Sequence, residues 1–340
     1  MPHRLPPIVL ALGLAASGLS GCGGSGAAAA STTTVTAPAV THTVIAPTDD
    51  ERPASASTTA GSPTTTVSPS TSAPSTTPPA AGTTSSAAPT SAPASTPAPV
   101  AGGVTEAGFD AAAGAYLKGR KGHVGVFAVD LTDGRQVQHN AGQRCETASM
   151  VKLDVLLTLL LQRQDAGKPL SSSDRALTSS MIINSDNNAT TTLWGRIGQH
   201  EGVRAANRRF GMTETEPGTS YRWGLTTTTA ADQVRLLRNL VRDDGPLDQD
   251  SRDYALDLLG RVSDGQDWGI SAANPQHEAQ VKNGWLPRSD GWVVTSAGRA
   301  QTAAGHEVLL AAVSCEVSSQ QHGIETIEHL AEMAASALDR

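Results

Sequence analysis

The sequence is poor in the patterns that bind metals, nucleotides and nucleic acids. Its nine histidines show no spacing typical of a metal site. No G-x-G-x-x-G or phosphate-binding loop follows a predicted strand. The formal net charge of -7 at pH 7 leaves no basic footprint for a nucleic acid. We therefore expect no metal, no cofactor and no nucleic-acid partner. A histidine-dependent hydrolase is also disfavoured, because no G-x-S-x-G turn precedes a predicted helix.

Only three cysteines are present. Cys22 follows an apolar run over residues 8–19 that is too short to span a bilayer, so residues 1–21 are interpreted as a secretory signal peptide. Leu-Ser-Gly-Cys resembles the bacterial lipoprotein processing box, which implies lipidation of Cys22 and anchorage on the outer face of the cell membrane. The alternative is an ordinary signal peptide with a chance cysteine. Cys145 and Cys315 then form either one disulfide or remain as two buried thiols.

Residues 22–103 lack aromatic side chains, and their charges are confined to residues 49–52. Such a segment cannot bury enough apolar surface to offset its conformational entropy. We expect a disordered tether, with a root-mean-square span of roughly 50 Å, between the lipidated cysteine and a folded domain over residues 104–340. That domain is long enough for one large hydrophobic core or two lobes.

The folded part shows a clear order of periodic segments. Two strands joined by an Asp133-Gly134 hairpin turn precede a helix with leucines on every face, which starts at Ser149 and should be buried all round. A block of helices, three strands and a last helix follow. This order predicts an α+β fold, in which an antiparallel five-stranded sheet is flanked by helices and carries an inserted all-helical lobe. The predicted ranges are helix 105–118, strands 123–131 and 135–140, helices from 149 to 261, strands 280–285, 291–300 and 306–313, and helix 324–338.

Three short motifs lie in this part of the chain, and the first is Ser149-Met-Val-Lys152. Its serine and lysine lie one helical turn apart on the same face. Burial would favour the neutral amine of Lys152, which can take the proton of a nucleophilic Ser149. Lysine is scarce, with five residues against 20 arginines, yet two of the five fall within motifs. Because arginine cannot give up its proton, a site that needs a switchable amine must use lysine.

The second motif is Ser185-Asp186-Asn187. In a catalytic interpretation Ser185 relays a proton to the leaving group, and Asn187 binds a substrate amide. The alternative is an ordinary helix N-cap, a position that all three residue types favour.

The third motif is Lys282-Asn283-Gly284, followed by Trp285. Lys282 would supply a positive charge for a substrate carboxylate, with Asn283 beside it. Gly284 would let substrate approach the backbone closely. The N–H groups of Trp285 and Ser149 would form an oxyanion hole.

The ordered motifs resemble those of the class A β-lactamases and the penicillin-binding D-Ala-D-Ala peptidases of the same fold, over residues 105–340. The resemblance implies an acyl-enzyme on Ser149 formed from a β-lactam or a peptidoglycan-derived peptide. Asn283 departs from the family, which has Thr or Ser there. The deacylating glutamate of the family matches only faintly at Glu216, with Glu214 as the other candidate, and both are otherwise exposed loop acids. We therefore expect weak deacylation. The alternative is a cell-envelope binding or scaffolding domain that kept the fold without turnover.

Overall fold

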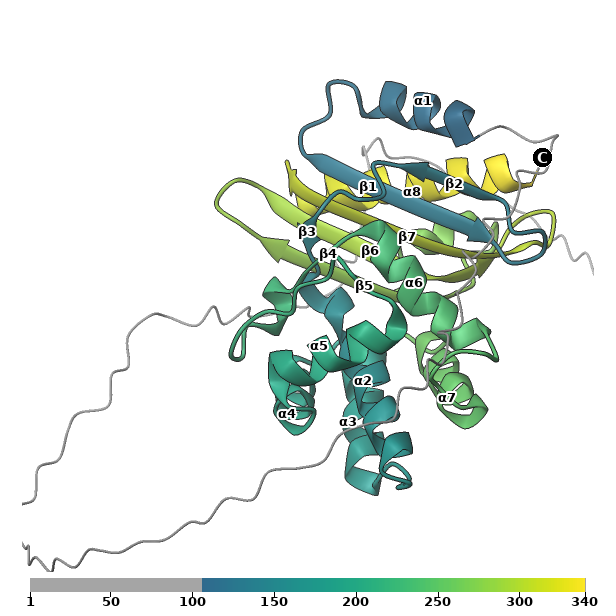
Figure 1. Ribbon diagram of the computed structural model, residues 1–340. Helices are drawn as coiled ribbons and strands as arrows, with labels where there is room; N and C mark the ends of the chain where they lie inside the picture. Colours follow the sequence, from purple (N-terminus) through teal and green to yellow (C-terminus); the bar gives the residue numbers. More distant parts are fainter. Residues whose placement is uncertain (1–105, 340) are drawn as a thin grey trace, which may run out of the picture. The chain divides into compact units, whose positions relative to one another are not determined.

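The computed structural model describes residues 106–339 (Figure 1). The predicted signal peptide over residues 1–21, Cys22 and the predicted tether up to residue 103 lie outside the described residues. No helix within 106–339 has the length and apolar character needed to cross a membrane. The described part combines helices with one five-stranded antiparallel sheet, so the predicted fold class is confirmed.

The sheet has the strand order β2-β1-β7-β6-β5, and neighbouring strands are antiparallel. The first two strands form the predicted hairpin, in which Gly134 takes a positive φ of 79°. The last three strands form a meander that ends at the β5 edge. The strand bounds are β1 (His123–Asp130), β2 (Gln136–His139), β5 (Ala279–Pro287), β6 (Trp292–Gln301) and β7 (Glu307–Val317).

Helices cover both faces of the sheet and create two hydrophobic cores (Figure 1). The first and last helices, α1 (Glu106–Leu117) and α8 (Gln320–Leu338), pack on one face. The opposite face packs against α2 (Val151–Asp165) and α6 (Ala230–Val241). The remaining helices complete the predicted lobe around α2. They are α3 (Ser172–Ile183), α4 (Asn187–Arg196), α5 (Gln199–Phe210) and α7 (Gln249–Leu259).

Helix α2 is the axis of the helical lobe, and all its residues from Val151 to Leu161 are buried. This matches the prediction from leucines on every face. The helix was predicted to begin at Ser149, whereas the structure places this serine in a short 3-10 turn over Ala148–Met150 that leads into α2. Such turns are common at helix ends, where the hydrogen-bond pattern tightens.

A second, two-stranded pairing was not predicted. Strand β3 (Cys145–Glu146) pairs with β4 (Thr227–Thr228), and the N–H of Thr147 donates to the carbonyl of Thr226 at 2.7 Å. Two-residue strands carry no measurable periodicity, so the sequence gives no signal for them. The pairing fastens the segment immediately before Ser149.

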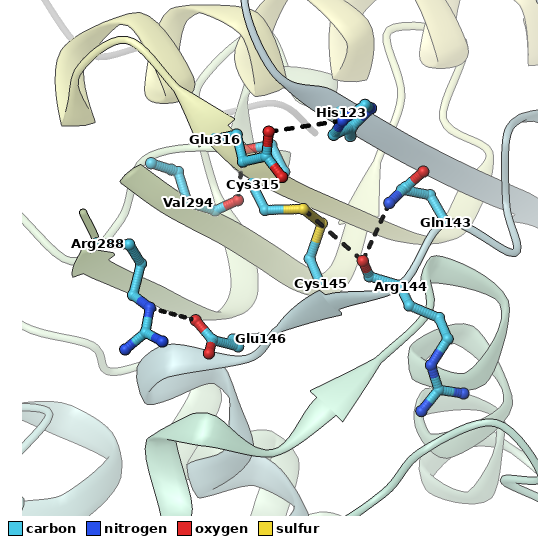
Figure 2. Close-up of a disulfide and its surroundings, with 10 residues drawn as sticks. His123, Gln143, Arg144, Cys145, Glu146, Arg288, Val294, Cys315 and Glu316 are labelled. Carbon is cyan, nitrogen blue, oxygen red and sulfur yellow. Dashed lines mark hydrogen bonds and ion pairs between the residues drawn. A yellow bond between two sulfur atoms is a disulfide. The ribbon is translucent and has the colours of Figure 1, made fainter. Parts of the chain in front are cut away.

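A disulfide fastens the same segment from the other side (Figure 2). It joins Cys145 of β3 to Cys315 near the end of β7, with a Cα–Cα distance of 5.7 Å. Beside it, the guanidinium of Arg288, just after β5, pairs with Glu146 at 3.2 Å. The chain that leads to Ser149 is therefore tied to both the middle and the edge of the main sheet.

Loss of the disulfide is expected to destabilise the protein. Replacing both Cys145 and Cys315 with alanine should lower the free energy of unfolding by about 2–5 kcal/mol, because the bridge closes a long loop in the unfolded chain. Urea unfolding of the full chain measures this. Reductant should lower the stability of the wild type by a similar amount and leave the double variant unchanged. Equal stability of all four samples would contradict the prediction.

An unpaired carboxyl group lies inside the helical lobe. Asp154 of α2 is fully buried, and neither of its oxygens has a hydrogen-bond partner. Burial raises the pKa of Asp154 to about 7, although the amide of Gln233 on α6 acts in the opposite direction. The Oε1 atom of Gln233 also lacks a donor. A protonated Asp154 can supply that donor, so the folded protein retains this proton up to near-neutral pH.

The raised pKa makes stability depend on pH. Between about pH 4 and 7 the unfolded chain ionises Asp154 while the folded chain keeps it protonated, so this residue costs stability as pH rises. Replacing Asp154 with asparagine should therefore stabilise the protein increasingly across this range, by at most about 4 kcal/mol at pH 7. Urea unfolding at pH 4 and pH 7 measures the difference. The exposed Asp250→Asn change is the control, and an Asp154→Asn effect of the same size at both pH values would refute the expectation.

Candidate active site

The amine of Lys152 joins the first two motifs. Its Nζ lies 3.0 Å from Ser149 Oγ and 3.0 Å from Ser185 Oγ. It also lies 2.5 Å from the Ser185 carbonyl oxygen and 2.8 Å from Asn187 Oδ1. Ser149 is partly exposed, so its hydroxyl is reachable, whereas Lys152 is fully buried. The structure thus brings four predicted site residues, from segments far apart in the sequence, around one nitrogen.

Backbone conformation positions both serines. Ala148, which precedes Ser149, has a φ of 47°, and Ser185 has a φ of 54°. Residues other than glycine rarely adopt this left-handed region, and each such case costs on the order of 1–3 kcal/mol. Ser185 occupies the bend between α3 and α4, where its side chain and its carbonyl both face Lys152. The surrounding packing holds these two residues in conformations that they would not adopt alone.

Both interpretations of the second motif apply, to different residues. Asp186 is the N-cap of α4, since its Oδ1 accepts a hydrogen bond from the N–H of Ala189 at 2.7 Å. The residues on either side of it, Ser185 and Asn187, instead contact the amine of Lys152. The helix cap therefore fixes the loop that carries the two polar contacts.

The environment of Lys152 favours its neutral form. Burial lowers the pKa of Lys152 well below its usual range, the nearby charge of Lys282 lowers it further, and Asp186 acts in the opposite direction. No carboxylate in the described part of the chain forms an ion pair with this amine. The indole ring of Trp223 lies 5.1 Å from Nζ and covers it.

Hydrogen-bond capacity leads to the same conclusion. The Ser185 carbonyl and Asn187 Oδ1 can only accept, so they take the two protons of a neutral amine. Its lone pair then remains for a serine hydroxyl, and Ser149 Oγ lies 3.0 Å away. This arrangement is what a lysine needs in order to act as a proton acceptor for Ser149.

Gly284 of β5 has a different structural reason from the predicted one. A Cβ atom at this position would lie 2.5 Å from the Thr147 carbonyl oxygen and 2.7 Å from the nitrogen atoms of Ser149 and Met150. The space beside Gly284 is therefore occupied by the nucleophile turn, not left open for substrate. Glycine lets the edge of β5 contact this turn directly, which places Trp285 next to Ser149.

Lys282 and Asn283 are both turned into the protein. Burial lowers the pKa of Lys282 to about 7, and its Nζ donates to the Asn283 carbonyl at 2.8 Å. The Asn283 amide donates to the carbonyls of Gln266 and Trp268, both at 2.8 Å. The prediction that Asn283 contacts substrate is wrong in this structure, because its side chain is fully buried and its two amide protons are already bound. It fastens residues 266–268 onto β5.

The two candidate deacylation acids also lie elsewhere. The backbone of Glu216 pairs with Thr227, and its exposed side chain forms an ion pair with Arg204 of α5. Glu214 is exposed, and its N–H donates to Asp232 at 2.8 Å. Neither side chain contacts Ser149 or Lys152, so within residues 106–339 the interpretation as exposed loop acids holds.

Trp223 is a site residue that the sequence analysis missed. It belongs to a short 3-10 turn over Trp223–Leu225, and its indole N–H donates to Thr191 Oγ1 at 3.2 Å. This contact holds the ring between α4 and the Lys152 amine. Only the scarcity of aromatic residues, 3% of the chain, could have drawn attention to it.

Other polar and hollow features do not involve the motifs. Asp130, Asp133 and His306 place ligand atoms within 4.8 Å of one another, and they are the one such group in the described residues. However, His306 already pairs with Asp130 at 2.6 Å, and Arg135 pairs with Asp133 at 2.6 Å. Two surface cavities, of about 490 and 300 Å³, lie at α1–β2 and between α2, α3 and α7. None of these features contains a residue of the three motifs.

Known proteins share this fold. The TLA-1 extended-spectrum beta-lactamase matches with a TM-score of 0.63 at 16% identity, covering 69% of this chain and 99% of that one. A class A beta-lactamase from Mycobacterium abscessus matches with a TM-score of 0.59 at 22% identity, covering 68% and 100%. The protein PBP-A, solved as an acyl-enzyme complex with penicillin G, matches with a TM-score of 0.59 at 17% identity, covering 68% and 97%. The fold is that of the β-lactamases and penicillin-binding proteins.

Sequence comparison names the family. The beta-lactamase enzyme family matches residues 109–174 and 160–338, and the chain belongs to this family. A Mycobacterium bovis protein named "Putative lipoprotein LppW" is 30% identical over 183 residues, which are 52% of this chain and 56% of that protein. Mycobacterium tuberculosis proteins of the same name match equally well. The chain thus spans about half the length of the curated relatives that it matches.

Proposed function

We propose that this protein is a serine hydrolase that forms an acyl-enzyme on Ser149 with Lys152 as the base. The observation that carries the proposal is the buried Lys152 amine, which lies within hydrogen-bond distance of both serine hydroxyls and has no carboxylate partner in the described residues. A neutral amine in this position accepts the Ser149 proton as Oγ attacks a carbonyl carbon.

The remaining steps follow from the same contacts. As Ser149 Oγ bonds to the carbonyl carbon, negative charge develops on the carbonyl oxygen, and the N–H groups of Ser149 and Trp285 are the proposed donors to it. Lys152 then returns the proton through Ser185 Oγ, at 3.0 Å, to the departing nitrogen. The bond between carbon and nitrogen breaks, the amine leaves neutral, and the acyl group stays on Ser149. Lys282 contributes by keeping the pKa of Lys152 low.

The proposed substrates are β-lactams or peptidoglycan-derived D-Ala peptides. The shared fold with PBP-A, which was captured as a penicillin G acyl-enzyme, supports this class. The name of the mycobacterial relatives supports a lipid anchor at Cys22 and a place on the outer face of the cell membrane. The tether over residues 22–103 and the domain over residues 104–340 complete the proposed organisation.

The missing deacylation base favours a second candidate function. No carboxylate among the described residues contacts Ser149 or Lys152, so the domain can bind or retain an acyl group without releasing it. In that case the protein acts as a cell-envelope binding domain. Acylation itself separates the two candidates, because a pure binding domain gives no covalent product.

The test is covalent labelling of the full-length protein. After incubation with benzylpenicillin, intact mass should increase by the mass of one penicillin, and peptide mapping should locate it on Ser149. The Ser149→Ala variant is the control and should show no increase. An unlabelled wild type, or equal labelling of both proteins, would refute the proposal.

A further inference from the structure

Two tryptophans form an aromatic rim beside the nucleophile. Trp285 directly follows Gly284, whose backbone contacts the Ser149 turn. The ring of Trp285 lies 6.0 Å from that of Trp268, at an interplanar angle of 55°. Both side chains are partly exposed, and Trp285 packs against neither hydrophobic core of the described residues. In a chain with 3% aromatic residues, an unpacked indole at this position requires a reason.

The second tryptophan is held in place by a clamp of hydrogen bonds. Besides the Asn283 amide, Ser296 Oγ on β6 accepts from the Ile270 N–H at 3.0 Å. Glu328 of α8 accepts from the Gly269 N–H at 3.3 Å. Gly269 has a φ of 90°, and a Cβ there would lie 2.5 Å from Ser296 Oγ. These contacts fix the segment that presents Trp268 to Trp285, so the rim is a built surface.

The rim offers no free positive charge from β5. Its basic residue, Lys282, is fully buried and donates inward to the Asn283 carbonyl. Arg288, in the turn that follows, is paired with Glu146 at 3.2 Å (Figure 2). The charged group that does reach the Trp268 segment is the carboxylate of Glu328. An anionic substrate group at the rim would therefore meet an acid and two indole rings.

We infer that the rim of Trp268 and Trp285 receives an uncharged, apolar group of the substrate, and that the enzyme prefers substrates without a carboxylate beside the scissile bond. This inference rests on the proposed function. Trp285 carries one of the two N–H groups proposed for the oxyanion, so its indole lies within one residue of the reacting carbonyl. An apolar or aromatic group on the substrate gains contact area with both rings. A carboxylate there would lose hydration without gaining a cation.

Benzylpenicillin and its methyl ester test this directly, since they differ only in the carboxylate. The rate at which each acylates Ser149 in the full-length protein is measured by intact mass and divided by its rate with hydroxylamine in solution. We expect the ester to acylate at least as fast as the acid. Trp285→Ala and Trp268→Ala should each slow the ester by roughly tenfold and slow the acid less, and Trp285→Phe should restore much of the ester rate.

Tyr116→Ala is the matched control, because Tyr116 stacks on His329 away from the motifs. It should leave both rates unchanged. A faster reaction of the acid than of the ester overturns the inference, as do tryptophan variants that slow both compounds equally. If neither compound acylates Ser149, the proposed function itself fails. Failure of the inference alone therefore appears as acylation with the opposite preference.

Discussion

Replacing Lys152 with arginine is expected to slow acylation of Ser149 by about 10²–10⁴-fold, the usual contribution of a general base. Arginine keeps the positive charge but cannot give up its proton, so no lone pair remains for the Ser149 hydroxyl. The rate of adduct formation with benzylpenicillin measures the effect. Ser149→Ala should abolish the adduct entirely.

Lys168→Arg serves as the control, since Lys168 is exposed and lies outside the motifs. It should acylate at the wild-type rate. Because a buried guanidinium can also disturb packing, Lys152→Ala provides a second variant, and thermal unfolding shows whether each protein is folded. A folded Lys152 variant that acylates at the wild-type rate would rule out lysine as the base.

The second large effect concerns the fate of the adduct. Hydrolysis of an acyl-serine needs a group that activates water, and no carboxylate in the described part of the chain contacts Ser149 or Lys152. The absence of a placed general base slows such a step by about 10²–10⁴-fold. The penicillin adduct on Ser149 should therefore persist after excess penicillin is removed. Intact mass followed over time measures its lifetime.

Rapid, repeated hydrolysis of a chromogenic cephalosporin would contradict this expectation. In that case Glu214→Gln and Glu216→Gln decide whether one of the loop acids moves into the site. Both residues lie on the exposed loop before β4, so either variant should fold normally. Unchanged turnover in both would instead leave Lys152 as the group that activates water.

The sequence predicted the elements that depend on periodicity and spacing. The leucines of α2, the Asp133-Gly134 hairpin and the last three strands have strong local patterns, and the five-stranded sheet follows from them. The motif order also predicted that Ser149, Lys152 and Ser185 would come together. Periodicity and short motifs are read from neighbouring residues, so these features need no knowledge of the tertiary structure.

The remaining features depend on contacts between distant segments. Asn283 was expected to face substrate, but its amide is bound by carbonyls 15 and 17 residues earlier in the chain. Gly284 was assigned to substrate approach, whereas the Thr147–Met150 turn occupies that space. Trp223 reaches Lys152 from a loop without any repeat. No local pattern records such packing, because its partners are set by the assembled fold.

The disulfide at Cys145 gives the site a dependence on cellular compartment. Disulfides persist in oxidising surroundings and are kept reduced in the cytosol. In a reducing compartment, the chain before Ser149 keeps only its two-residue pairing with β4 and the ion pair between Glu146 and Arg288. The reactive serine then gains its final support only after the bridge forms. For an exported chain, maturation of the nucleophile is thereby postponed until the protein has reached the place where its substrates are.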